Sequence, residues 1–150
     1  MLTVLLISLV AVTWYGTNVM KQFYLDRQAE DLKARIKLVE NRIEPLFRAK
    51  KDKALNLFCR EVGSASQTRI TVIEKDGRVV ADSMEDPEHM ENHADREEVI
   101  QAMAGKVGRS ERLSRTLGIN MLYVAAPLRH EAGGKVFGTR RSLSPGVIKT

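Results

Sequence analysis

The sequence predicts an α+β protein in which a long N-terminal helix precedes a five-stranded antiparallel sheet with one crossover helix. Three observations support this fold class. Residues 1–20 carry no charged side chain, the next segment has apolar residues at helical spacing, and the remainder alternates short β-branched runs with glycine-containing turns. A chain of 150 residues that is 43% hydrophobic has room for one ordinary domain and an appendage.

Residues 1–20 are predicted to form a transmembrane helix. A helix of about 20 residues rises roughly 30 Å, which matches the hydrocarbon core of a bilayer. Trp14 and Tyr15 lie near its end, where aromatic rings favour the headgroup region. The alternative is a cleaved signal peptide, which needs a basic first region and a cleavage site of small residues, and neither is evident. We therefore expect the membrane to be a partner.

The charged residues that follow do not settle which side of the membrane they occupy. Lys21 and the later basic residues would lie in the cytoplasm by the positive-inside count, but a basic segment before Met1 would reverse that result. The net charge of +5 does not predict nucleic-acid binding, because acidic and basic residues are interleaved. The single cysteine, Cys59, excludes an internal disulfide and is expected to be a small buried hydrophobe.

Residues 21–44 are predicted to form a coiled-coil-like stalk helix, because apolar residues recur at alternating spacings of four and three. These positions are Leu25, Ala29, Leu32, Ile36, Val39, Ile43 and Leu46. In one interpretation the stripe is the seam of a homodimer, formed by Leu25, Leu32, Ile36, Val39 and Ile43. In the other, the stripe packs on the protein's own domain, since helical periodicity alone does not identify the partner.

A second helix is expected over residues 45–63, packing on the domain. Proline removes a helical hydrogen bond, so Pro45 should end or kink the stalk helix near Glu44. Gly63-Ser64 should end the second helix.

Residues 69–143 are predicted to form the sheet domain. The runs Ile70–Ile73 and Val79–Ala81 flank Asp76-Gly77, which is a strong hairpin signal. Three more strands are expected at 109–115, 121–126 and 135–138, with turns at 116–118 and 133–134. Between the second and third strands, Asp95 should cap a helix, with Glu98 three residues on, that stops at Gly105. This element order is typical of a PAS-like or single Cache-like sensor fold.

Motifs spread over roughly half of the chain also resemble a known family. They are Arg69-Ile70-Thr71-Val72-Ile73, Asp76-Gly77-Arg78-Val79, Ala81-Asp82-Ser83, Met90-Glu91-Asn92-His93, Arg96-Glu97-Glu98-Val99, Ala102-Met103-Ala104-Gly105-Lys106-Val107-Gly108, Ser110, Arg112, Ser114, Thr116-Leu117-Gly118 and Met121-Leu122-Tyr123-Val124-Ala125. Together they resemble the extracytoplasmic domain of phosphate-regulon-type bacterial sensor histidine kinases.

The resemblance implies a signal-sensing domain anchored in the bacterial inner membrane, outside the cytoplasm, that passes a conformational shift through a dimeric helix to a two-component phosphorelay. The chain departs from the family in two ways: no second span or kinase core follows, and Thr139-Arg140-Arg141-Ser142 is more basic than an apolar last strand. We therefore expect an N-terminal fragment with a tail at 144–150 and no enzymatic activity of its own. The alternatives are the sensor module of a chemoreceptor or cyclic-dinucleotide enzyme, and a stand-alone membrane-anchored scaffold that binds a partner protein.

A small-ligand pocket is expected between the sheet and the crossover segment. Arg109, Arg112 and Tyr123 would be its polar contacts, because guanidinium groups bind carboxylates in a bidentate manner and tyrosine adds a hydroxyl to an apolar wall. His93 and Arg96 are further ligand-binding candidates. Alternate strand residues face opposite sides, so one of the two strand arginines could be solvated.

Metal and catalytic chemistry have weaker signals. His89 and His93 are four residues apart, but two imidazoles without a third fixed ligand are weak metal candidates. Ser83, Ser110 and Ser114 have no histidine and acid at a spacing that would make them nucleophiles. We expect no metal, no cofactor and no catalytic residue in this chain.

Overall fold

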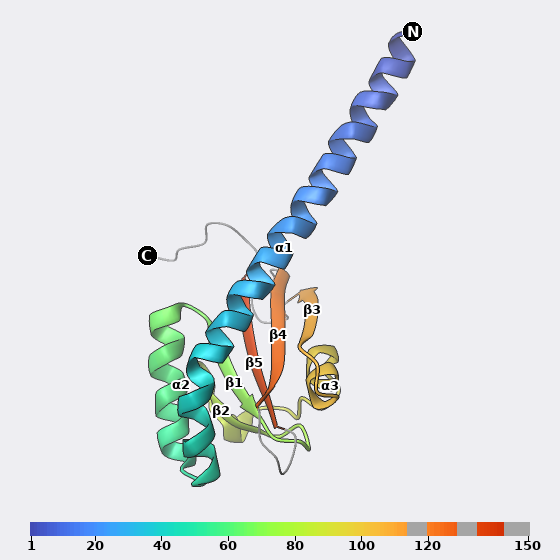
Figure 1. The fold of residues 1–150 in the computed structure, drawn as a ribbon. Coiled ribbons are helices and arrows are strands. Elements are labelled where there is room, and N and C mark those ends of the chain that lie inside the picture. Colours follow the sequence, from blue (N-terminus) through green and yellow to red (C-terminus); the bar gives the residue numbers. More distant parts are fainter. Residues whose placement is uncertain (114–119, 129–134, 143–150) are drawn as a thin grey trace.

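The computed structural model describes residues 1–113, 120–128 and 135–142. The turns predicted at 116–118 and 133–134, Ser114 and the tail at 144–150 lie outside these residues. The elements are the helices α1 (Leu2–Arg48), α2 (Asp52–Ser66) and α3 (Glu97–Met103), the short 3-10 helix η1 (Pro87–His89), and the strands β1 (Arg69–Ile73), β2 (Val79–Asp82), β3 (Gly108–Leu113), β4 (Asn120–Leu128) and β5 (Lys135–Ser142) (Figure 1).

The strands form one sheet in the order β2-β1-β5-β4-β3, and every neighbouring pair is antiparallel. The last strand in the sequence therefore lies in the middle of the sheet, and β2 and β3 lie at its edges. A mixed helix and sheet fold with a long N-terminal helix and antiparallel strands was expected from the sequence, and that expectation is confirmed.

Apolar residues cover both faces of the sheet. On β4, Leu122 and Val124 belong to the core cluster shared with α1 and α2, whereas Ala125 belongs to a second cluster with Val99 and Ala102 of α3. Because neighbouring strand residues point to opposite faces, one apolar strand supplies both cores. The helices α1 and α2 thus cover one face, and α3 covers part of the other (Figure 1).

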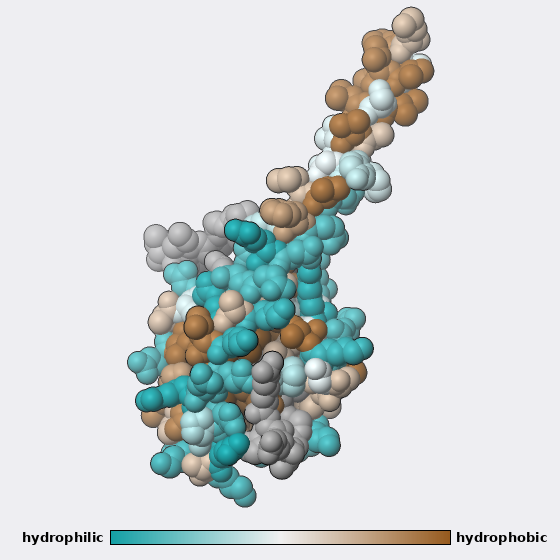
Figure 2. All heavy atoms as spheres, viewed as in Figure 1, coloured by the Kyte–Doolittle hydropathy of each residue, from teal (hydrophilic) through white to brown (hydrophobic). Residues whose placement is uncertain are grey.

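The N-terminal part of α1 extends away from the domain with its apolar side chains exposed (Figure 2). Among the described residues, α1 is the one helix long and apolar enough to cross a membrane. The predicted span at 1–20 lies in this exposed part.

The apolar stripe of α1 packs on the protein's own domain. Leu25, Leu32, Ile36 and Ile43 are buried within the single chain, and Val39 is partly buried against the same core. The assignment of these five residues to a dimer seam is therefore wrong for this conformation, because a stripe that already covers the sheet is not available to a second helix. The alternative interpretation of the stripe is the one that holds.

The boundaries of the first two helices differ from those expected. Helix α1 continues through Pro45 to Arg48, because Leu46 and Phe47 pack against the core and hold its last turn in place. The break comes at Lys50, which has a φ of 50°. Helix α2 is therefore Asp52–Ser66 and not 45–63.

Two glycines have roles other than those expected. Gly63 does not end α2 but brings it close to β2, since a Cβ there would lie 2.5 Å from the Cβ of Ser83. Gly77 has a φ of +86° in a turn closed by the Glu74 N–H, which donates to the Arg78 carbonyl at 2.8 Å. The β1–β2 hairpin thus has a longer turn than the two-residue turn that Asp-Gly predicts.

Candidate functional site

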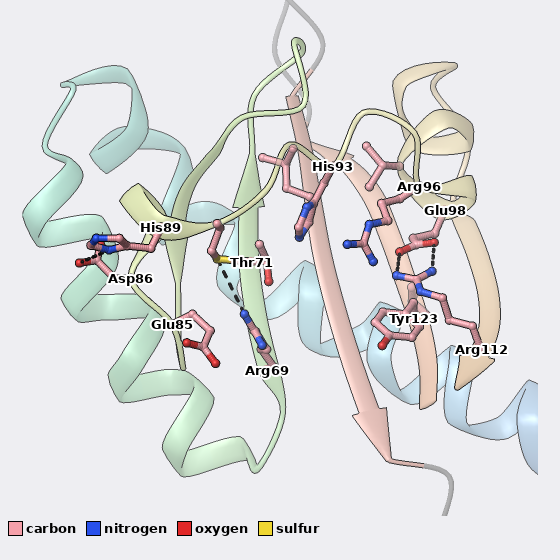
Figure 3. Close-up of a pocket in the computed structure, with 14 residues that line it drawn as sticks. Arg69, Thr71, Glu85, Asp86, His89, His93, Arg96, Glu98, Arg112 and Tyr123 are labelled. Carbon is pink, nitrogen blue, oxygen red and sulfur yellow. Dashed lines mark hydrogen bonds and ion pairs between the residues drawn. The ribbon is translucent and has the colours of Figure 1, made fainter. Parts of the chain in front are cut away.

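A cavity of about 290 Å³ lies on the α3 face of the sheet, under the segment that joins β2 to α3 (Figure 3). Its polar lining residues are Arg69, Thr71, Glu85, Asp86, His89, His93, Arg96, Glu98, Arg112 and Tyr123. They come from β1, the joining segment, α3, β3 and β4, so the fold gathers them from most of the domain. The site has the position that the sequence predicted for a pocket.

Arg112 is held by a bidentate contact with Glu98. Its Nη1 donates to Glu98 Oε2 at 2.7 Å and its Nη2 donates to Oε1 at 2.8 Å, while the Ser110 hydroxyl donates to Oε2 at 2.6 Å. The guanidinium also stacks on the Tyr123 ring, 3.6 Å from its centre. These contacts hold the Arg112 side chain in the cavity wall.

The protonation states of this pair follow from the contacts. Burial raises the pKa of Glu98, but the hydrogen bonds from Arg112 and Ser110 outweigh it, and the net pKa lies below the ordinary value. Burial likewise lowers the pKa of Arg112, and the hydrogen bond and charge of Glu98 outweigh that effect and raise it. Both side chains are charged at neutral pH, so the charge of Arg112 is already balanced.

Arg69 is balanced in the same way. Its Nε donates to Asp82 Oδ2 at 2.9 Å, and Thr71 Oγ1 donates to the same oxygen at 2.6 Å. The other oxygen of Asp82 accepts the backbone N–H groups of Met84 and Glu85. Asp82 is fully buried, and its contacts hold the start of the segment that roofs the cavity.

Arg96 differs from these two arginines. Within the part of the chain that the structure describes, its half-buried guanidinium has neither an ion-pair nor a hydrogen-bond partner. It lies at the start of α3, beside His93, and both side chains point into the cavity (Figure 3). A cationic group without an internal partner at the edge of a cavity is able to bind an anion.

His93 presents a neutral ring to the same space. Burial, and then the charge of Arg96, lower its pKa from the ordinary value, so the imidazole is neutral near pH 7. Its Nδ1 is buried and has no hydrogen-bond partner among the described residues. The backbone of this residue is fixed, because its N–H donates to the Gly77 carbonyl at 2.8 Å and its carbonyl accepts the Arg96 N–H at 3.2 Å.

The metal candidates do not form a cluster. His89 lies 3.4 Å from Asp86, and both side chains are largely exposed. In residues 1–113, 120–128 and 135–142, no group of three or more His, Cys, Asp or Glu side chains is arranged to hold a metal ion.

The structure brings four of the five predicted ligand-binding residues together and separates one. Arg112, Tyr123, His93 and Arg96 line the cavity. Arg109 does not, because it lies on the opposite face of β3, where its Nη1 pairs with Asp26 of α1 at 2.5 Å. The candidacy of Arg109 as a cavity contact is therefore wrong.

Arg69 and Glu98 are among the cavity residues that the sequence did not indicate as ligand-binding residues. Arg69 could have been found, because Ile70 and Val72 mark the core face of β1 and the alternate positions must face the other way. Glu98 was assigned to a capping box with Asp95, but α3 begins after Arg96 without a side-chain cap, and the Glu98 carboxylate turns to Arg112. No local pattern signals that contact.

The comparisons with known proteins give the fold. No family model matches the sequence, and no match was found among curated proteins. The sensor domain of the V. cholerae histidine kinase DctB is similar in structure, with a TM-score of 0.56 and 18% identity over 88% of this chain and 58% of that chain. The ligand-binding domain of the Campylobacter jejuni chemoreceptor Tlp3, in complex with 4-methylisoleucine, has a TM-score of 0.48 and 8% identity over 79% of this chain and 60% of that chain.

The chain thus shares its fold with the DctB sensor domain. The chain spans less than two thirds of the length of the DctB domain. At this identity the likeness defines the fold and not the ligand.

Proposed function

We propose that this chain is a membrane-anchored sensory domain, the input module of a two-component sensor histidine kinase, whose cavity binds a small carboxylate. The fold supports the sensory role, since sensor domains of histidine kinases and chemoreceptors are its structural neighbours. The observation that carries the ligand class is the unpartnered guanidinium of Arg96 in the cavity.

Arg96 favours a ligand with a negative group at the α3 end of the cavity. Of the three arginines that line the cavity, Arg69 and Arg112 are paired with Asp82 and Glu98, whereas Arg96 has no such partner among the described residues. The carboxylates of Glu85 and Asp86 also line the cavity, but they lie at its other end (Figure 3). A carboxylate that forms a bidentate contact with Arg96 would pair with its charge. The volume of about 290 Å³ lies at the small end of known ligand pockets, so it fits a small metabolite.

The remaining parts of the proposal concern the assembly. The exposed apolar part of α1 would anchor the domain in the bacterial inner membrane, with the cavity outside the cytoplasm, as in phosphate-regulon-type kinases. A homodimer would use a surface other than the buried stripe of α1. Phosphorylation would belong to a kinase core outside these residues. A chemoreceptor or a cyclic-dinucleotide enzyme as the output would leave the site unchanged.

The test is a thermal-shift measurement of the full chain in phosphatidylcholine nanodiscs with acetate, succinate, inorganic phosphate and calcium as separate probes. A carboxylate at 100 times its Kd stabilises the folded state by about 2.7 kcal/mol, which raises the Tm by several degrees. Arg96→Gln should abolish that rise. The control Arg78→Gln alters an exposed ion pair with Glu74 in the β1–β2 turn and should keep it.

A carboxylate ligand is contradicted if neither carboxylate raises the Tm, or if the rise persists in Arg96→Gln. A rise with calcium alone would instead indicate a cation site.

A further inference from the structure

The strand β3 contacts the cavity wall with one of its faces. Ser110 and Arg112 both bind the buried carboxylate of Glu98. Gly108 lies so close to α3 that a Cβ there would clash with the Glu98 carbonyl oxygen. Every second residue of the strand, from Gly108 to Arg112, is thus packed on α3 at the cavity.

The other face of β3 contacts α1. Arg109 pairs with Asp26 at 2.5 Å, and Glu111 pairs with Lys21 at 3.2 Å. These partners lie directly after residues 1–20, the apolar part of α1. The strand therefore binds α1 where the exposed apolar segment begins, and it does so through charged pairs and not through the apolar core.

The position of β3 in the sheet leaves it less restrained than the central strands. It lies at the sheet edge, and among the described strands it pairs only with β4. An edge strand is held by backbone hydrogen bonds to one neighbouring strand, whereas a central strand is held by such bonds on both sides. An edge strand can therefore shift with the loss of fewer hydrogen bonds. Strand β4 also contributes to the cavity and packs on α1, but it lies inside the sheet and contacts α1 through the apolar core. Strand β3 is therefore the strand at the sheet edge that contacts both the cavity wall and α1, and it is the freer of the two to move.

We propose that β3 couples the cavity to α1. A carboxylate bound at Arg96 would place a second negative charge beside Glu98 (Figure 3). Repulsion between the two carboxylates would weaken the contact of Glu98 with Arg112, loosen β3 from α3 and change the two ion pairs that join β3 to α1. The outcome is a population shift between two positions of α1 relative to the sheet. This inference rests on the proposed function of the cavity as the input site.

The experiment uses the full chain in phosphatidylcholine nanodiscs without any ligand, and follows amide hydrogen exchange of residues 21–27. Lys21→Gln combined with Asp26→Asn removes the two pairs directly, and two exposed pairs together account for about twofold to thirtyfold in a local opening constant. Glu98→Gln, which acts only at the cavity, should raise exchange of residues 21–27 by a factor of the same size. The triple variant should exchange no faster in residues 21–27 than the double variant, because Glu98→Gln and the double substitution disrupt the same two ion pairs.

The control variant Glu74→Gln breaks an exposed pair in the β1–β2 turn and should leave exchange of residues 21–27 unchanged. Residues 70–73 should stay protected from exchange in Glu98→Gln, which would show that the domain is still folded. If they do not, Arg112→Lys is used instead, because it keeps the positive charge and loses the bidentate contact with Glu98.

The proposed coupling is overturned if Glu98→Gln leaves the exchange of residues 21–27 at the wild-type rate, or if removal of the two ion pairs has no effect on it. It is also overturned if the increase in the triple variant is the product of the two separate increases. The exchange experiment uses no ligand, so it tests the coupling even if no carboxylate raises the Tm. Conversely, a negative exchange experiment would not contradict carboxylate binding in the cavity.

Discussion

Replacing Leu32 with alanine tests where the stripe of α1 packs. Leu32 is fully buried in the core that α1 shares with the sheet. Truncation of a buried leucine removes its transfer free energy and leaves a cavity, which together cost about 2–5 kcal/mol of unfolding free energy. Leu38 lies on the same helix but is 80% exposed, so Leu38→Ala should change the unfolding free energy by no more than about 0.5 kcal/mol.

The assay is urea unfolding of the full chain in a neutral detergent, followed by circular dichroism at two protein concentrations tenfold apart. If Leu32 packs within its own chain, the loss caused by Leu32→Ala is the same at both concentrations. If it packs in a two-chain seam, the loss depends on concentration, because association is linked to folding. A loss that varies with concentration, or an equal loss for Leu38→Ala, would refute the intramolecular packing.

Three further substitutions or modifications have defined outcomes. Gly108→Ala should destabilise the chain by at least about 1–3 kcal/mol in thermal denaturation, because its Cβ would meet the Glu98 backbone. Gly16→Ala, with no atom within 4 Å of the new Cβ, should cause no loss of stability, because alanine is favoured over glycine inside a helix. Cys59 should resist iodoacetamide in the native chain and react after unfolding, since burial raises the pKa of its thiol to about 12; native-state labelling would contradict this. The pKa of His93 is lower in the folded chain than in the unfolded chain, so the unfolded chain takes up the proton first as the pH falls. The free energy of unfolding should therefore decrease below about pH 6.5, by at most about 1.4 kcal/mol per pH unit. Urea unfolding at pH 7 and 5.5 should show this decrease in the wild type and not in His93→Gln, and an equal decrease in both would contradict the prediction.

Much of the fold follows from local patterns in the sequence, but the order of the strands does not. Strands β1 and β2 were recognisable from their β-branched runs, β4 from its apolar run, and β3 as a polar segment before a turn that contains glycine. Strand β5 was recognisable from the Gly133-Gly134 pair before it. The position of β5 between β1 and β4 was not, because pairing between strands far apart in the sequence leaves no local signal. The partner of the α1 stripe had the same limit, since an apolar stripe has the same spacing whether a sheet or a second helix covers it.

The sequence predicted which strands contribute to the site, but not which of their alternate residues face the cavity. On β4, the residues on both sides of Tyr123 are apolar, so the sequence does not show which face carries the core. Once Tyr123 is placed opposite Ser110, the alternation of β3 puts Arg112 in the cavity and Arg109 against α1. The face of the sheet on which Tyr123 lies therefore decides the roles of both arginines, and the sequence does not show it.

Glu98 shows why a correct local rule can still fail. A glutamate three residues after an aspartate predicts a capping box, which contributes about 1 kcal/mol to a helix. In the structure the carboxylate instead accepts two hydrogen bonds from a guanidinium and one from a hydroxyl, with almost no exposure to water. Charge-assisted hydrogen bonds are stronger than a cap, and leaving Arg112 half-buried without a counter-ion would cost more than losing the cap. The tertiary contact therefore prevails over the local one, and it does so at the residue that joins α3, β3 and the cavity.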